Sequence, residues 1–337
     1  MNSPITGKPM KLVKEPGVML AFRKEEFEIT YHYYLCEESG ERFTTDEEDR
    51  INQTQVHNQY RERYGIPFPD EIKEIREMYG ISASKMSDIL GFGTNGYRLY
   101  ESGEIPSVAN GRLILAIKQP VDFIKQVEAS SNLISDKEKR TLLSHANGLV
   151  EQQMGKTWDL ILLKHLFLYE LPNQYSGYRK PNLMKLANVI AFFSERMGLF
   201  KTKLNKLLFY TDFGYYKKTA YSMTGLTYRA IPLGPVPAQY DILFNKLCED
   251  NLININQELI NGTENYGDLI KSCISFDASL FDQDEQKILE EVATKFKDHY
   301  AKQMVDLSHQ EKAWEQNKES KSKIISYQKY AFDLVNM

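Results

Sequence analysis

Side chains suited to sequence-specific chemistry lie between positions 82 and 106, where polar residues surround a pair of glycines. Asn binds adenine through two hydrogen bonds, and Arg binds guanine in the same way or holds a phosphate. Asn95 and Arg98 fall in or next to the first turn of an expected helix. We therefore predict contacts with DNA, made by the following side chains: Ser82, Ser84, Lys85, Thr94, Asn95 and Arg98.

Two short helices separated by a turn are expected to position these side chains. Ser82 is a favourable N-cap, and apolar residues recur on one face of the helix that follows it. Gly91 and Gly93 permit a tight turn. Tyr97 and Tyr100 are three residues apart and should pack inward. This pattern predicts a helix-turn-helix that binds the major groove, and a role in dimerisation alone is the alternative.

The amino-acid composition limits the classes of protein to which this chain can belong. The chain has 337 residues, of which 42% are hydrophobic and 26% are charged, so we expect two or three domains with proper cores. Three cysteines far apart are typical of a reducing compartment. The sequence has no apolar run of membrane-spanning length and no apolar segment typical of a signal peptide. We predict a soluble, cytoplasmic protein with no membrane partner.

The net charge of −4 is unevenly distributed. Residues 67–120 carry 6 Lys and Arg against 7 Asp and Glu, so the expected DNA-binding segment is nearly neutral. Residues 179–229 carry 10 against 2, whereas residues 230–337 carry 11 against 18. We expect the basic block to fold against the acidic part of its own domain, and an acidic partner surface is the second interpretation.

The predicted fold class is α+β and mostly helical, with four regions along the chain. Residues 1–66 form a small β-rich module that resembles a zinc ribbon, and residues 67–120 form the helix-turn-helix domain. Residues 121–178 form a helical connector, and residues 179–325 form a mainly helical domain with a small sheet.

Within the last region we expect helices at 182–193 and 203–213 and a strand near 221–231. Pro235 and Pro237 suit the start of a helix that continues to Leu247. Residues 251–274 are expected to form a strand pair with Asn261–Gly262 as its turn. A helix is predicted at 281–300 and a turn at 307–314.

The N-terminal module has the spacing of two zinc knuckles without their ligands. Ser3, Thr6, Cys36 and Ser39 occupy the positions where cysteines are expected, and His32 is a lone further candidate. Structural zinc needs four sulfur or nitrogen ligands, and hydroxyl groups do not replace them. We therefore predict no metal.

Residues 1–118 resemble the antitoxins of the MqsA type, in which a two-knuckle module precedes a helix-turn-helix. The matching run is Gly93, Asn95, Tyr100, Glu101 and Gly103. The resemblance implies that Asn95 contacts bases. The chain departs from the family at Leu99, where Arg is frequent, and at Ala83, where related helices carry a phosphate-binding Gln. Because of these departures, we expect the operator sequence to differ from those that the family binds.

Residues 179–320 are similar to the Panacea domain, also called SocA-like. The similarity rests on four segments, at 203–213, 224–228, 234–237 and 307–314. It implies a domain that neutralises a bacterial toxin by direct binding, without catalysis and without a cofactor.

Most residues of these segments are expected to be structural, because the apolar side chains recur at helical spacing. Long basic and aromatic side chains are also typical of binding hot spots, so a weaker prediction places partner contacts at Lys201, Lys206, Lys217, Lys218 and Tyr221. Asp212 and His309 could form an acid–base pair, but a polar contact that holds the last turn is favoured.

Together these features predict an antitoxin that binds a protein toxin and, as a dimer, its own operator DNA. A transcription regulator with a protein- or ligand-sensing C-terminal domain is the alternative. An enzyme that uses Asp212 and His309 ranks last.

Overall fold

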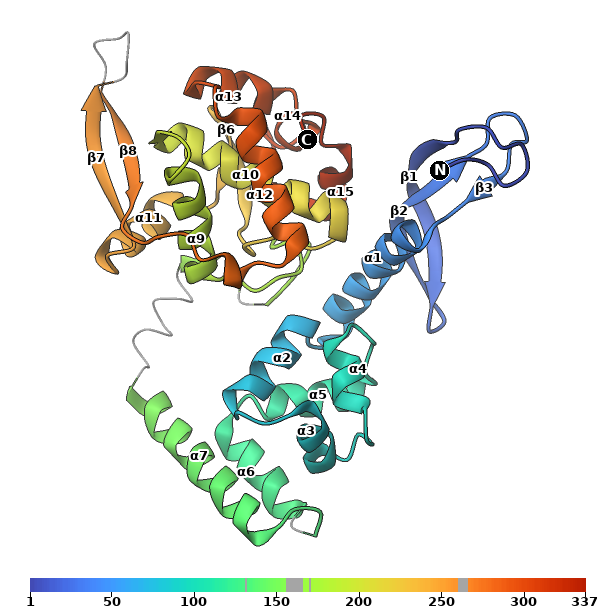
Figure 1. Cartoon of the computed structure of the whole chain (residues 1–337), viewed down its shortest axis with the longest axis vertical. Coiled ribbons are helices and arrows are strands. Elements are labelled where there is room, and N and C mark those ends of the chain that lie inside the picture. Colours follow the sequence, from blue (N-terminus) through green and yellow to red (C-terminus); the bar gives the residue numbers. More distant parts are fainter. Residues whose placement is uncertain (131, 156–165, 170, 260–265) are drawn as a thin grey trace. The chain divides into compact units, whose positions relative to one another are not determined.

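The protein is a mostly helical α+β chain with small antiparallel sheets (Figure 1). The computed structural model describes residues 1–130, 132–155, 166–169, 171–259 and 266–337. Two compact units are present, one made of Met1–Val56 with Leu166–Met337 and the other of His57–His165. The finer division into four regions stays a prediction. None of the helices in the described residues is long and apolar enough to cross a membrane.

The N-terminal residues form an antiparallel sheet of order β1-β2-β3. Its strands are β1 (Lys11–Phe22), β2 (Glu25–Leu35) and β3 (Arg42–Phe43). Helix α1 (Asp46–Tyr64) follows and binds the backbone of β2. Asn52 accepts from the His32 amide at 2.8 Å and donates to the His32 carbonyl at 2.9 Å. These paired bonds attach the sheet to the helix.

The unit of residues 57–165 is helical. After α1 it contains α2 (Pro69–Met78), α3 (Ala83–Leu90), α4 (Gly96–Glu101), α5 (Val108–Ala116), α6 (Pro120–Ala129) and α7 (Asp136–Gly155). Apolar side chains from α2 to α7 share one core, in which Tyr79 stacks on Phe123 with ring centroids 3.7 Å apart. The helices of the expected connector therefore pack on the expected helix-turn-helix through buried residues such as Phe123 and Val127.

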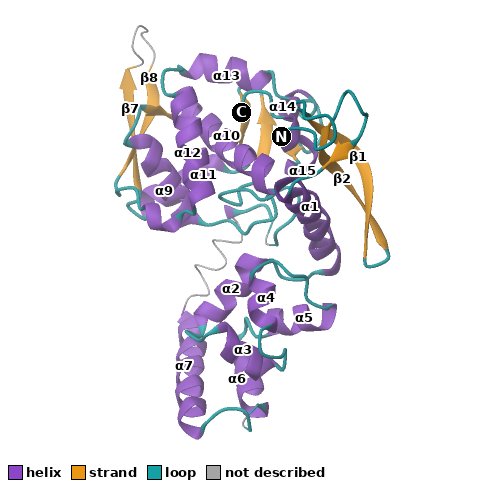
Figure 2. Cartoon of the chain, turned by 45° about the vertical axis from the view of Figure 1, so that its right-hand side comes forward, coloured by secondary structure: helices purple, strands orange, loops and turns teal. Residues whose placement is uncertain are grey.

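The C-terminal part surrounds one buried helix, α10 (Lys201–Thr219), in which every residue from Lys203 to Tyr216 is buried (Figure 2). Helices of this part are α9 (Leu183–Ser194), α11 (Tyr240–Glu249), α12 (Gln283–Phe296), α13 (Ala301–His309), α14 (Lys312–Glu315) and α15 (Tyr327–Tyr330). Short 3₁₀ turns are η1 (Ala278–Leu280) and η2 (Ala331–Asp333). A helix that is buried on all sides belongs in the core of a domain.

Two small sheets flank this core. One has the order β4-β8-β7 and consists of β4 (Leu199–Phe200), β7 (Ile253–Leu259) and β8 (Tyr266–Ser272). The other has the order β6-β5-β9 and consists of β5 (Tyr228–Ile231), β6 (Gly234–Pro237) and β9 (Ile324–Ile325). The predicted strand pair in 251–274 is confirmed as β7 and β8, whereas its predicted turn, Asn261–Gly262, lies outside the described residues.

Two predicted elements are wrong. Pro235 and Pro237 lie in strand β6 and do not begin a helix, which starts only at Tyr240. Proline is tolerated there because β6 is an edge strand, where a missing N–H breaks no ladder. Residues 307–309 continue helix α13, where we expected a turn.

Candidate functional site

Helices α3 and α4 are short and are joined by a glycine-containing turn. The Ser82 hydroxyl accepts from the Lys85 amide at 3.2 Å and caps α3. Gly91 ends α3 in the left-handed conformation with φ of 71°, which glycine adopts at low cost. Tyr97 is fully buried in α4, and its hydroxyl donates to the Ile72 carbonyl at 2.8 Å. These contacts fix the angle at which α4 leaves the turn.

Most of the residues predicted to bind DNA are exposed on or next to α3 and α4. Thr94, Asn95 and Arg98 are exposed, as are Ser82 and Ser84 on α3. Asn95 stands at the N-cap of α4, where its side chain makes no capping hydrogen bond. Its amide group is therefore not required to cap the helix.

Lys85 differs from the other predicted DNA ligands, because it forms an ion pair with Glu138 of α7 at 3.2 Å. Its ammonium is thus partly neutralised within the same unit. Tyr100 packs against the core of this unit as expected, although it is only half-buried and its hydroxyl accepts from Asn110 at 3.0 Å.

An ion pair that the sequence analysis missed holds α4 against α2. Arg76 donates to Glu101 at 2.5 Å and to the Ile81 carbonyl at 3.0 Å. Both side chains of the ion pair are less than one fifth exposed, so the pair is shielded from solvent more than a surface ion pair. Glu101 positions the helix in this structure.

The two knuckle-like turns of the N-terminal module face each other. Gly7 and Gly40 donate to the carbonyls of Ser3 and Cys36 at 2.9 and 2.8 Å, and Thr6 Oγ1 lies 3.5 Å from Cys36 Sγ. Hydrogen bonds, chiefly from the Ser3 side chain, lower the pKa of the Cys36 thiol to about 6. The described residues contain no group of three or more His, Cys, Asp or Glu side chains placed to hold a metal.

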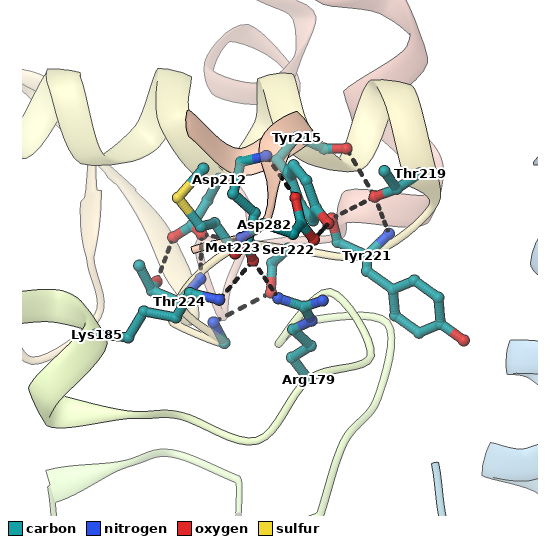
Figure 3. A network of polar contacts seen from close by, with 12 residues as sticks. Arg179, Lys185, Asp212, Tyr215, Thr219, Tyr221, Ser222, Met223, Thr224 and Asp282 are labelled. Atoms are coloured by element: carbon teal, nitrogen blue, oxygen red, sulfur yellow. Dashed lines mark hydrogen bonds and ion pairs between the residues drawn. The ribbon is translucent and has the colours of Figure 1, made fainter. Parts of the chain in front are cut away.

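The C-terminal part is organised around Asp212 of α10, which is fully buried (Figure 3). Its carboxylate accepts from the amides of Met223 and Thr224 at 2.9 and 2.7 Å, from the Thr224 hydroxyl at 2.6 Å and from the Tyr228 hydroxyl at 2.8 Å. Burial raises the pKa of Asp212, and these hydrogen bonds oppose the shift. Asp212 therefore orders the turn before β5.

His309 does not pair with Asp212. Its Nε2 atom lies 3.1 Å from the Pro232 carbonyl, and its ring stacks on Trp314 with centroids 3.7 Å apart. Trp314 donates to the Ile231 carbonyl at 2.7 Å. Both residues hold the turn between β5 and β6, so neither the acid–base pair nor the polar contact between Asp212 and His309 that the sequence favoured is formed.

Lys206, which was expected at the surface, is fully buried. Its ammonium donates to the Pro235 carbonyl at 2.9 Å, and burial lowers its pKa to about 7. Gly234 lies against it, because a Cβ added there would stand 2.3 Å from Ser308 Oγ and 2.8 Å from Lys206 Cε. The segment 234–237 is thus required for close packing against α10.

The remaining residues of the predicted partner surface contact other parts of the same chain. Lys201 pairs with Asp241 at 2.5 Å, and Lys218 pairs with Asp284 at 2.6 Å. Lys217 donates to the carbonyls of Leu334 and Met337 at 2.8 and 2.6 Å. Tyr221 is half-buried, and the Arg179 guanidinium lies 5.9 Å from its ring centroid.

Several residues of the basic block form ion pairs with acidic residues of the same domain, as expected. Arg179 and Lys185, both labelled in Figure 3, donate to Glu285 of α12, and Arg196 pairs with Glu290 at 3.0 Å. Together with the pairs of Lys201 and Lys218, these contacts join residues 179–229 to residues 230–337. The prediction that the basic and acidic parts fold against each other is confirmed.

Comparison with protein families gives one match. The family model described as Antitoxin SocA-like, Panacea domain, matches residues 204–315. This segment begins in α10 and ends with α14, and it includes Asp212, Lys206, Gly234 and His309. Comparisons of the chain with curated proteins and with solved structures give no match.

Proposed function

We propose that this protein is an antitoxin that binds and inhibits a partner protein toxin through the domain containing residues 204–315. The observation that carries the proposal is the match of this segment to the SocA-like antitoxin family. The characteristic polar residues of the segment are used for folding: Asp212 and His309 each hold a turn of the same domain. Neutralisation would therefore be steric or conformational, without a chemical step and without a cofactor.

The partner-binding surface is proposed to include Tyr221 together with the neighbouring Lys218 and Lys217, which are half-buried. A tyrosine at a binding surface offers a large apolar area and one hydroxyl group at low entropic cost. Lys206 is left out of this surface because it is buried.

We propose further that the α3–α4 pair binds the operator of the protein's own operon, with Asn95 and Arg98 contacting bases or phosphates. The exposed, uncapped Asn95 side chain at the start of α4 supports this assignment. One short helix buries little surface, so tight binding would need a homodimer on a palindromic site.

Co-expression tests the proposed antitoxin activity. The adjacent open reading frame is induced alone, with the full-length chain, or with an empty vector. We expect growth arrest in the first and third cultures and growth in the second, and a complex of the two proteins should co-purify. A neighbouring gene that is harmless when expressed alone would instead favour a transcription regulator whose C-terminal domain senses a ligand or protein.

A further inference from the structure

A cavity of about 580 Å³ opens where the N-terminal ends of α10 and α13 approach β8. The residues that matter for its chemistry are Lys201, Thr202, Lys203, Asp268, Lys297 and His299. Its volume lies in the range of small-molecule sites. The structural roles described above for residues 204–315 do not involve this cavity.

The strongest indication of a ligand is the ammonium group of Lys203. The residue is only 6% exposed, yet no carboxylate of the described chain lies within ion-pair distance of it. Its Nζ atom donates to the Lys297 carbonyl at 2.8 Å, whereas an ammonium has three protons to donate. Burial lowers the pKa of Lys203, and the charge of Asp298 opposes the shift.

The N-terminal end of α10 also favours an anionic ligand. Phe200, the N-cap of α10, has no side chain that can cap the helix, and the first turn contains no acidic residue. The first amides of an α-helix have no partner within the helix, and they favour an anion. In the described part of the chain, Nδ1 of His299 is also buried without a hydrogen-bond partner.

The charges around the cavity are of both signs. Lys201 is neutralised by Asp241 at 2.5 Å and by Asp268 at 3.6 Å. Of the lining charges that remain, Lys203 and Lys297 are positive and Asp298 is negative. Because Lys201 faces two carboxylates, these six formal charges sum to zero, and the preference for an anion rests on the Lys203 ammonium and the N-terminal end of α10.

We propose that this cavity binds a small molecule through its phosphate group, with the Lys203 ammonium and the amides at the start of α10 as donors. Phosphate suits such a site because several oxygens can accept from an ammonium and from successive amides at once. The proposal does not depend on toxin neutralisation or on DNA binding.

Calorimetric titration of the full-length protein with inorganic phosphate, at constant ionic strength and with chloride as the reference anion, tests the proposal. We expect saturable binding, accompanied by a rise in the unfolding temperature that follows phosphate concentration. Absence of saturable binding to the wild-type protein would overturn the proposal. Nucleoside phosphates, titrated next, distinguish a free phosphate ligand from a larger phosphorylated one.

Three variants locate the site. Lys203→Met keeps the length of the side chain without its charge, and should weaken phosphate binding at least tenfold. Thr202→Asp places a carboxylate at the helix N-terminus, and should weaken binding equally while it favours folding of α10. Lys287→Met removes an exposed lysine of α12 from the same unit and should leave binding unchanged. Wild-type affinity in Thr202→Asp would contradict the site even if Lys203→Met did not fold.

Discussion

At the scale of residues, Asp212 has the clearest structural role. It is the acidic member of a buried helix, and its two carboxylate oxygens accept from three donors of the turn between α10 and β5 and from the Tyr228 hydroxyl of β5. A buried carboxylate without such donors would be strongly unfavourable. We therefore interpret Asp212 as a residue that builds the domain and not as a catalytic base.

Replacing Asp212 by Asn should destabilise the protein by about 3 kcal/mol, because an amide group cannot accept from all four donors and brings two protons of its own. Chemical denaturation measures this change. Asp284→Asn is the matched control, since its partly exposed ion pair with Lys218 contributes at most about 1 kcal/mol. Equal unfolding free energies for the two variants would contradict the role given to Asp212.

At the scale of elements, the helices with periodic apolar residues could be predicted from the sequence. Helices α3, α9 and α10 lie where spacing and caps indicate them. Segment 234–237 was misplaced because proline at a helix start and proline in an edge strand have the same local signal. Only the pairing of β6 with β5 distinguishes them, and pairing is a long-range property.

The residues of the candidate sites also divide into those that local sequence predicts and those that depend on distant contacts. Ser82, Thr94, Asn95 and Arg98 are exposed as their helical positions require. Burial of Lys206 could not be predicted, because lysine is seldom buried and its partner, the Pro235 carbonyl, is distant in sequence. A lone aspartate within the apolar run of α10 was the available signal for the Asp212 network.

At the scale of the whole molecule, the N-terminal sheet belongs to the same compact unit as the C-terminal part. The His32 ring contacts Phe332 of η2 edge to face, with centroids 4.7 Å apart. Burial, with a smaller contribution from the charge of Lys14, lowers the pKa of His32 to about 4. A neutral histidine is therefore part of the contact between the two ends of the sequence.

This contact predicts a dependence of stability on pH. Since the pKa of His32 is lower in the folded state than the usual 6.5, its contribution is present above pH 6.5 and is lost as the pH falls toward 4. Between pH 7 and 4.5 the loss should be about 2 kcal/mol. Denaturation of the wild-type protein and His32→Gln at both values measures it, and equal pH dependence of the two proteins would refute the assignment.

The central claim is that one chain combines operator binding by α4 with toxin neutralisation by a different part of the sequence. The most direct measurement compares Asn95→Ala with the wild-type protein for both activities, with Ser102→Ala at the other end of α4 as the control. We expect Asn95→Ala to bind operator DNA about tenfold or more weakly and to rescue growth as well as the wild-type protein. Equal operator affinity of Asn95→Ala and the wild-type protein would contradict the account.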